Sequence, residues 1–394
     1  MYPTAQQYID LLTKKRAQDS LASKWGVELV YDSSHTPVFH IGTHGIVFKI
    51  RELKSGKYRA YKFFIKDQYR LLERYSKIAS FRKGLTTTYM PRIVFREEAL
   101  TMKTDNGKTG KFPVLLMDWI EGERLNDYIL RIKSSPCELA DLFCKFMKLA
   151  SWLIQNGFVH GDLQPENILI DSNGNLVLVD FDNFRLSSTK EFNSNHDGAN
   201  DYAHPDGRSS GNDIKYCDDF TISLLALSLR AIVIDNTLLN SYNGTGGILL
   251  SEKDLKDISE SNILKKLFPS LDPILDELYG IFLKCYNDHQ LPISNFLSVV
   301  ERCDIPVYLN STPTKREKKY SIKDELGAVY SSDGLKLIKF NGFRYGHDQK
   351  VFEPNYGCMT ICNKAFDRNA FKCKIIIPES IRHSCKYPWL IFVV

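Results

Sequence analysis

The most constraining feature of the chain is a polar loop set between apolar runs in residues 160–180. Asp162 and Asn167 stand five residues apart in HGDLQPENILI, directly before an apolar run that predicts a short strand. A second apolar run, LVLV, follows and leads into Asp180. Asp162 can orient a hydroxyl nucleophile, and oxygens of Asn167 and Asp180 are ligands that Mg²⁺ prefers. The spacing therefore predicts a site for hydroxyl and metal chemistry.

A glycine-bearing turn and a lysine in an apolar strand lie upstream. Gly42 and Gly45, in IGTHGIVFKI, lie between a pair of predicted strands, and their missing side chains let backbone N–H groups approach phosphate oxygens. Lys62 follows in YRAYKFF, a third predicted strand. Because burying an ammonium group without an anion is costly, Lys62 needs a carboxylate partner. Glu73 is the only glutamate in the helix predicted over residues 66–83, so we expect it to pair with Lys62.

Hydrophobic periodicity divides the chain into a β-rich region and a helical region. Short runs rich in β-branched and aromatic residues occupy residues 37–65 and return at 92–97 and 112–119, whereas the chain is mostly helical after residue 122. A charged stretch with a proline, NSTPTKREKKYSIKDE, predicts a linker. The pattern therefore predicts an α+β protein with a helical extension over 1–29, a β-rich region followed by a helical region, a linker over 306–325 and a small β-rich unit over 326–394.

Charge, hydropathy and cysteine usage narrow the range of partners. The net charge of +5 is spread along the chain, so no basic patch indicates a nucleic-acid partner. No window approaches the run of roughly 18 uncharged apolar residues that a membrane helix needs. The nine cysteines include no C-x-x-C pair, which favours reduced, packed thiols. We therefore expect a cytoplasmic protein that binds neither nucleic acid nor membrane.

Taken in order along the chain, these motifs resemble those of the eukaryotic-type protein kinase superfamily. GTHGIVFK resembles the glycine-rich loop, Lys62 the strand lysine, Glu73 its helix partner and HGDLQPEN the catalytic loop, while DFD stands where the family has DFG. The likeness covers about residues 30–305. It implies a two-lobed fold, with a β-rich N-lobe and a helical C-lobe, that takes ATP and Mg²⁺ as cofactors.

The resemblance also implies roles for individual residues. Met117 corresponds to the gatekeeper, and the stretch from Asp118 to Ile120 corresponds to the hinge that offers backbone groups to adenine. Lys62, held by Glu73, would grip the α- and β-phosphates. The implied set is: catalytic Asp162, Lys62 and Asn167; nucleotide-binding Gly42, Gly45, Val47, Lys62, Glu73, Met117, Asp118 and Ile120; and metal-binding Asn167 and Asp180.

Two further likenesses lie downstream of the metal site. Pro205 and Asp206, in GANDYAHPD, resemble the end of an activation segment, and Asp218 resembles the buried aspartate that braces the catalytic loop. Ser187, Ser188 and Thr189 fall in the expected activation segment. This cluster is open to autophosphorylation, and it is equally an ordinary polar loop.

The chain departs from the family pattern at four positions. Gly161 replaces the usual arginine before the catalytic aspartate, which removes a receiver for a phosphorylated loop. Gln164 stands where Ser/Thr kinases carry a lysine near the transferred phosphate. Asp182 replaces the DFG glycine, and Ala199 the threonine that touches the catalytic aspartate. These changes put catalytic efficiency and phosphorylation-based switching in doubt.

Three functions therefore stay open. The first is a protein kinase that phosphorylates Ser or Thr in a protein substrate. The second is a pseudokinase that binds nucleotide, or nothing, and acts as a scaffold. The third is a small-molecule kinase of the aminoglycoside or choline type, which shares the fold and the HGD motif. We favour the first because the run LQPENILI and the segment YAHPD are closer to protein kinases, and because Lys62, Asp162, Asn167 and Asp180 are all present.

The C-terminal segment resembles leucine-rich repeats of the BspA type. The matching residues are Ile361, Ala365, Phe366, Ile375, Ile377, Pro378 and Ser380. Only about one full repeat is present, so a solenoid of three or more stacked units cannot form. Two interpretations remain: a small β-rich cap on the helical lobe, or an element that docks a protein partner.

Overall fold

The protein is described by a computed structural model that covers most of the chain. The described residues are 2–67, 70–103, 109–186, 202–206, 218–270, 272–303, 321–332, 336–341, 351–352, 354, 360–361 and 374–375. They fall into two units. The first holds the described residues up to Leu125, those of 156–186, and Asp218; the second holds 126–155, 202–206, and the residues from Asp219 onward.

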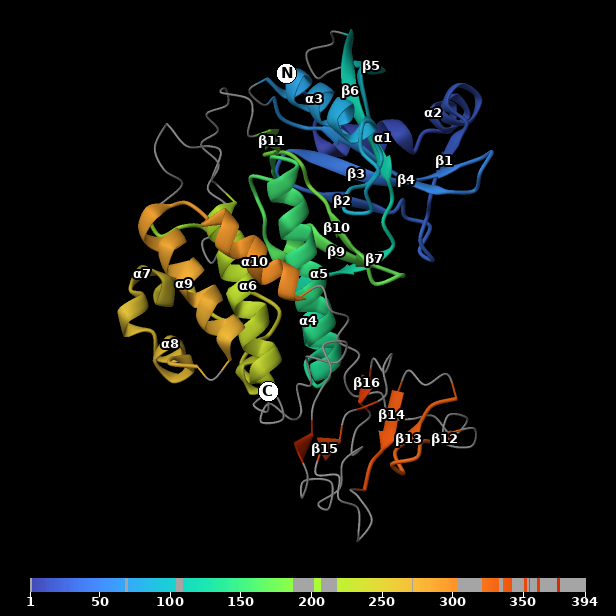
Figure 1. Cartoon of the computed structure of the whole chain (residues 1–394). Helices are drawn as coiled ribbons and strands as arrows, with labels where there is room; N and C mark the ends of the chain where they lie inside the picture. Colours follow the sequence, from blue (N-terminus) through green and yellow to red (C-terminus); the bar gives the residue numbers. More distant parts are fainter. Residues whose placement is uncertain are drawn as a thin grey trace. The chain divides into compact units, whose positions relative to one another are not determined.

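The first unit is built on a six-stranded antiparallel sheet (Figure 1). Its strands run in the order β1-β3-β4-β6-β5, with β2 also paired to β3. The strands are β1 (Val27–Leu29), β2 (Phe39–Ile41), β3 (Gly45–Glu52), β4 (Tyr58–Phe64), β5 (Ile93–Lys103) and β6 (Thr109–Asp118). Helix α3 (Leu71–Lys83) packs against β5. The strands predicted over 92–97 and 112–119 are thus confirmed as segments of two longer strands.

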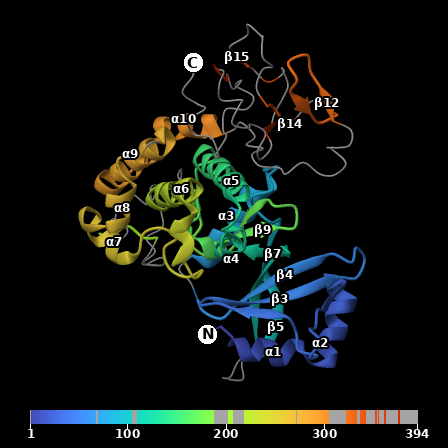
Figure 2. The same ribbon diagram turned by 90° about the horizontal axis from the view of Figure 1, so that it is seen from below.

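The N-terminal segment belongs to this unit's hydrophobic core. The predicted helical extension over residues 1–29 contains α1 (Ala5–Leu12), α2 (Lys15–Ser20) and a π-helical turn (Leu21–Trp25), and its last residues form β1. Helix α1 lies against β3 (Figure 2). Tyr8 is fully buried, and its hydroxyl donates to the carbonyl oxygen of Phe64 at 3.0 Å. The predicted extension and the sheet therefore share one core.

Two small sheets in the first unit carry the polar loop found in the sequence. β9 (Ile168–Asp171) pairs with both β10 (Leu176–Leu178) and β7 (Gly122–Arg124), and β8 (Phe158–Val159) pairs with β11 (Arg185–Leu186). The loop between β8 and β9 ends in a 3₁₀ turn over Pro165–Asn167. Proline at the start of such a turn loses no hydrogen bond, because the first N–H groups lack a partner anyway.

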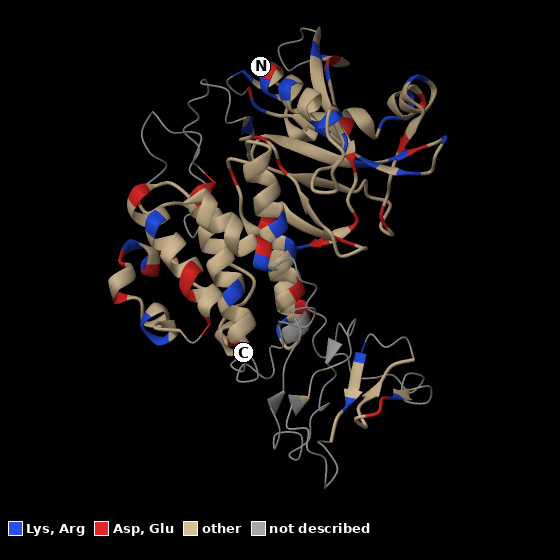
Figure 3. Cartoon of the chain, viewed as in Figure 1, with Lys and Arg blue, Asp and Glu red and all other residues tan. Residues whose placement is uncertain are grey.

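The second unit is helical. Its helices are α4 (Leu125–Ile132), α5 (Pro136–Gln155), α6 (Asp219–Ile234), α7 (Glu252–Lys256), α8 (Asn262–Leu267), α9 (Pro273–Asp288) and α10 (Ile293–Cys303). Helix α6 packs against α5 and α9 and is buried almost all round. Figure 3 shows few charged residues along it, as expected for a helix with little exposure to water. The mostly helical structure predicted after residue 122 is confirmed for this unit.

The segment from Tyr202 to Asp206 is fixed within the second unit. The hydroxyl of Thr221 donates to the Tyr202 carbonyl oxygen at 2.8 Å, and the Tyr202 hydroxyl donates to Gly246 at 3.0 Å. Nε2 of His204 lies 2.8 Å from the carbonyl oxygen of Tyr286. The predicted Ser187, Ser188, Thr189 and Ala199 lie outside the described residues.

The C-terminal region is a set of short strands. They are β12 (Ile322–Lys323), β13 (Val329–Tyr330), β14 (Lys336–Lys339), β15 (Val351–Phe352), β16 (Thr360–Ile361) and β17 (Lys374–Ile375). β14 pairs with β16, and β15 with β17, both in parallel. Of the repeat-like residues, Ile361 lies in β16 and Ile375 in β17; Ala365, Phe366, Ile377, Pro378 and Ser380 lie outside the described residues. Most of the predicted linker also lies outside them.

Among the described residues, none of the helices combines the length and the apolar character that crossing a bilayer requires.

Candidate nucleotide and metal site

Strand β4 places Lys62 next to the glycine-bearing turn. In the antiparallel register of β3 and β4, Val47 stands opposite Lys62 and Gly45 opposite Phe64. The N–H of Gly42 donates to the carbonyl oxygen of Gly45 at 2.9 Å and closes the turn. A Cβ on Gly45 would lie 2.7 Å from the Phe63 carbonyl oxygen and 3.1 Å from Cε of Lys62. Gly45 is therefore needed for the Lys62 side chain to pass.

The catalytic-loop candidates Asp162 and Asn167 are in direct contact. Nδ2 of Asn167 donates to the Asp162 carbonyl oxygen at 2.8 Å and to its Oδ2 at 3.1 Å. Nε2 of Gln164 reaches the same Oδ2 at 3.3 Å. Since the Nδ2 group of Asn167 is used in these bonds, its Oδ1 is the atom that can serve as a metal ligand.

The pairing of β9 and β10 brings Asp180 beside Asn167. Ile168 pairs with Leu178, and the N–H of Val179 donates to the Asn167 carbonyl oxygen at 3.0 Å. The Asp180 side chain is 50% exposed, and its backbone has a φ of 59°. A non-glycine residue in this left-handed region is uncommon and often marks a functional position. Asn167 and Asp180 thus offer two oxygen ligands of the kind that Mg²⁺ takes.

Lys62 contacts two carboxylates of the DFD segment. Its Nζ lies 3.1 Å from Oδ1 of Asp180 and also donates to Oδ1 of Asp182. The side chains of Lys62 and Asp182 are both more than nine-tenths buried. Burial alone lowers the pKa of Lys62, but the Asp182 carboxylate, Tyr75 and Asp180 outweigh burial and raise this pKa well above its usual value.

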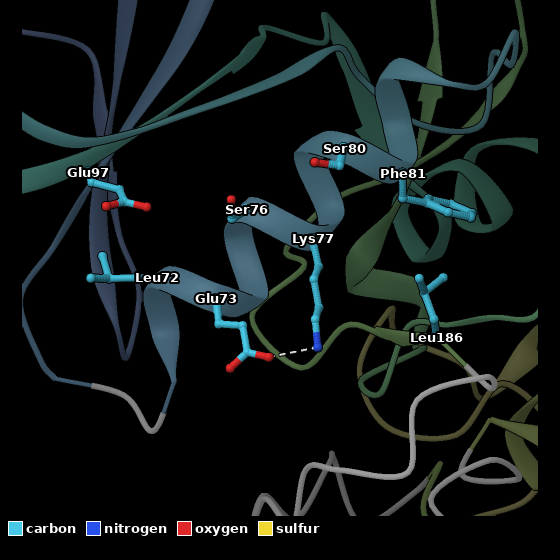
Figure 4. A pocket seen from close by; sticks show the side chains of 8 residues that line it. All are labelled: Leu72, Glu73, Ser76, Lys77, Ser80, Phe81, Glu97 and Leu186. Carbon is cyan, nitrogen blue, oxygen red and sulfur yellow. Dashed lines mark ion pairs between the residues drawn. The ribbon is translucent and has the colours of Figure 1, made fainter.

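The expected pair between Lys62 and Glu73 does not form. The Glu73 carboxylate instead pairs with Arg70 and, at 2.7 Å, with Lys77, and it is 35% exposed (Figure 4). Hydrogen bonds from Lys77 and Arg70 lower its pKa. Residues two apart on an α-helix point about 200° apart, so Tyr75, which is fully buried, turns toward the core and Glu73 away from it. This orientation of α3 is the reason that the prediction fails.

Glu73 lines a cavity on the outer face of α3 instead. The cavity has a volume of about 660 Å³, and Leu72, Lys77 and Phe81 are among its other lining residues (Figure 4). None of the other predicted site residues lines it. The structure therefore separates Glu73 from the group formed by Lys62, Asp162, Asn167 and Asp180.

Three residues around Lys62 were not assigned to the site from the sequence: Asp182, Tyr75 and Arg74. The Tyr75 hydroxyl donates to Oδ1 of Asp182, and Nη1 of Arg74 donates to the Asp182 carbonyl oxygen. Burial raises the pKa of Asp182, but the charge of Lys62 and the bonds from Lys62 and Tyr75 outweigh burial, so the net pKa is lowered. The sign of this arrangement in the sequence was Asp182 itself, which stands where the family has the DFG glycine.

Asp218 holds the predicted catalytic loop, and the backbone of that loop explains one departure from the family pattern. Asp218 is buried and accepts hydrogen bonds from the N–H groups of His160 and Gly161, the latter at 3.0 Å. Gly161 has a φ of +78°, and a Cβ there would lie 2.2 Å from the Asn183 carbonyl oxygen. No side chain fits at position 161, so the arginine that the family carries here is excluded by the backbone.

The predicted hinge is fixed by its aspartate. Asp118 ends β6, and its carboxylate pairs with Arg59 and, at 2.9 Å, with Arg92. Its backbone N–H donates to the Arg92 carbonyl oxygen at 3.2 Å. Asp118 can therefore offer adenine only its carbonyl oxygen. Met117 precedes it in the same strand and stands opposite Ala60 of β4, and Ile120 follows the strand.

Comparison with known proteins agrees with this arrangement. Residues 40–233 match the family model of the protein kinase domain, a range that contains the whole set of residues described above. The match confirms the predicted two-lobed kinase fold.

Several curated proteins are similar to the chain over a portion of its length. Protein kinase 3 of Dictyostelium discoideum is 25% identical over 167 residues, which are 42% of this chain and 18% of that protein. NUAK family SNF1-like kinase 2 of Homo sapiens is 30% identical over 166 residues, or 42% of this chain and 25% of that protein. CBL-interacting serine/threonine-protein kinase 20 of Arabidopsis thaliana is 25% identical over 150 residues, or 38% and 33%. The chain thus spans a third or less of each relative's length.

Proposed function

We propose that the protein kinase domain of residues 40–233 transfers the γ-phosphate of ATP to a Ser or Thr hydroxyl of a protein. The observation that carries the proposal is the approach of Lys62 Nζ to within 3.1 Å of Asp180 Oδ1. This pair puts a fixed positive charge beside a half-exposed carboxylate that suits a metal ion. A polyphosphate needs both groups within reach of its oxygens.

In the proposed reaction the acceptor hydroxyl attacks the γ-phosphorus in line with the β–γ bridging oxygen. Asp162 orients the hydroxyl and accepts its proton, the bond from phosphorus to the bridging oxygen breaks, and ADP leaves with that electron pair. Lys62 binds the α- and β-phosphate oxygens and neutralises charge there. When bound at Asn167 and Asp180, Mg²⁺ would screen the negative charge of the triphosphate. The protein's contribution is mainly position and charge.

The choice of a protein acceptor over a small molecule is supported by similarity to protein kinases, including one named as a serine/threonine-protein kinase. Gln164 in place of a lysine leaves one fewer positive charge near the transferred phosphate, so we expect slow turnover. The cytoplasmic location also remains a proposal, supported by the cysteine usage of the chain.

The proposal is tested with the full chain, labelled ATP, Mg²⁺ and a generic basic protein substrate. Because Asp162 handles the hydroxyl proton, Asp162→Ala should lower the turnover number by about 10²–10⁴-fold and leave ATP affinity nearly unchanged. Asp180→Ala should instead weaken the binding of Mg-ATP. Equal transfer by the wild type and both variants would show that the site is assigned wrongly.

One rival is favoured by a specific observation. Lys62 lacks the expected helix partner, which would suit a scaffold that no longer transfers phosphate. Such a protein would give no label on any acceptor and no activity that Asp162→Ala removes. Label on added aminoglycosides or choline, and none on protein, would instead favour a small-molecule kinase.

A further inference from the structure

The third residue of the DFD segment is the most tightly held carboxylate near the proposed nucleotide site. Oδ1 of Asp182 accepts hydrogen bonds from the Lys62 ammonium group and from the Tyr75 hydroxyl. Its carbonyl oxygen accepts from Nη1 of Arg74. These donors come from two elements, β4 and α3, and all four residues are buried. A carboxylate held this way has one position available to it.

Helix α3 offers no alternative anion to Lys62. Its sequence, LLERYSKIASFRK, contains a single acidic residue, Glu73. That carboxylate pairs with Arg70. It also pairs with Lys77 of the same helix, as Figure 4 shows. The inward position is taken by Tyr75, which carries a hydroxyl in place of a charge. To reach Lys62, Glu73 would have to break two ion pairs, and α3 would have to withdraw Tyr75 from the core.

We propose that Asp182 is the positioning residue for Lys62, and that Arg74 and Tyr75 of α3 hold Asp182 in place. This inference rests on the proposed function only for its consequence, namely that Lys62 is presented to phosphates. The carboxylate that anchors Lys62 therefore comes from the DFD segment and not, as in the family, from helix α3. Helix α3 still contributes, since its two consecutive donors fix Asp182, so α3 and the DFD segment are tied together without Glu73.

The replacement explains why the chain carries an aspartate where the family has a glycine. Lys62 sits in an apolar strand and is 7% exposed, so it needs a buried anion. Asp180 is half exposed and suits a metal ion, so it cannot also serve as the permanent partner. Asp182, two residues on, is directed at the same ammonium group from a buried position. One carboxylate is thereby left for the metal and one for the lysine.

The inference is tested first without nucleotide. The wild type, Asp182→Asn and Glu73→Gln are treated with acetic anhydride, and modification of Lys62 is measured by mass spectrometry relative to the exposed lysines. An ammonium group that loses its anion in a buried site gives up its proton more readily and reacts faster. We expect Asp182→Asn to speed Lys62 acetylation about tenfold, which corresponds to about 1.4 kcal/mol, and Glu73→Gln to leave it unchanged. The reverse pattern, or equal rates in all three proteins, would overturn the inference.

A second measurement joins the inference to nucleotide binding. We expect Asp182→Asn to raise the KM for ATP about tenfold or more with a smaller change in kcat, because a displaced Lys62 binds phosphates less well in the ground state. Tyr75→Phe removes a single donor to Asp182 and should shift KM in the same direction by less. If Asp182→Asn instead tightens ATP binding, Asp182 sequesters Lys62 and the inference fails.

The two proposals can fail separately. If the wild type transfers no phosphate while Asp182→Asn still speeds acetylation of Lys62, the proposed kinase function is refuted and Asp182 is supported as the positioning residue for Lys62. If phosphate transfer instead depends on Glu73 and not on Asp182, the role of Asp182 is refuted and the proposed kinase function is supported. Thermal unfolding of each variant, followed by circular dichroism, establishes that the measured proteins are folded.

Discussion

The loop of residues 160–167 and the segment of residues 180–182 hold the side chains of the proposed site by different means. In the loop, Asn167 bonds to Asp162, five residues away, and Asp218 accepts backbone N–H groups. In the segment, Asp182 is held by side chains that lie 107 to 120 residues away in sequence. The loop is thus held partly by contacts within itself and partly by Asp218, 57 residues from Gly161, whereas the donors to Asp182 come from a strand and a helix more than 100 residues away.

This difference shows how each region responds to substitution. A locally bonded loop keeps most of its shape when one contact is lost, since its other bonds remain. A buried charge held by distant donors leaves those donors without a partner when it is removed, and unpaired buried polar groups are costly. We therefore expect stability to depend more on Asp182 than on any single residue of the loop.

The largest expected effect follows removal of the Asp182 carboxylate. Asp182→Ala leaves Lys62 buried without its main anion, and breaking one side of a buried ion pair costs about 3–5 kcal/mol of unfolding free energy. Urea denaturation of the full chain measures this. Glu98→Ala, which breaks an exposed pair with Lys111, is the control and should change stability little. Similar losses in the two variants would show that the buried pair of Asp182 and Lys62 stabilises the fold no more than an exposed pair does.

The next effect concerns Gly161, and a matched glycine isolates its cause. Gly56 has a similar φ, +69°, but a Cβ there meets nothing within 4 Å. Gly56→Ala should therefore cost about 1–2 kcal/mol from its left-handed backbone alone. Gly161→Ala should cost about 1–3 kcal/mol more, because its Cβ would press on Asn183. Equal losses in urea denaturation would mean that the backbone at Asn183 yields without penalty.

A smaller and more local effect is expected at Asp218. Asp218→Asn replaces one acceptor oxygen by an NH₂ group, so one of the two loop N–H groups loses its partner, at a cost of about 1–3 kcal/mol. Amide hydrogen exchange should speed up at His160 and Gly161 and stay unchanged in β4. Faster exchange in β4 as well would show that the loop and the strand are not held independently.

The smallest effect is expected at Glu73. Glu73→Gln removes an exposed charge that pairs within α3, so the midpoint of thermal unfolding should not change measurably. A loss as large as that of Asp182→Ala would show that α3 can turn Glu73 toward Lys62 in solution.

The sequence could predict contacts that depend on local chain geometry, but not those that depend on how distant elements pack. Asn167 contacts Asp162 in the structure, and the register of β9 and β10, set by a tight turn, brings Asp180 close to Asn167, while the catalytic and metal-binding roles of these residues stay predictions. The β-rich order of the first unit and the mostly helical structure after residue 122 also followed from periodicity. The partner of Lys62 could not be predicted, since it depends on the rotation of α3 about its axis. Tyr75 and Glu73 compete for the inward position, and the gain from burying an aromatic ring decides the outcome.

The bond between the Tyr8 hydroxyl and the Phe64 carbonyl oxygen has a consequence for how the molecule can be shortened. Phe64 is the last residue of β4, two positions beyond Lys62. A fragment that begins at residue 30 lacks the Tyr8 ring, which covers Phe63 and the buried face of β3. Apolar surface of the sheet would then be exposed to water, which favours aggregation. The first 29 residues therefore form part of the core of the first unit, and proteolytic removal of α1 should abolish the proposed kinase activity even though every polar group of the proposed site is still present.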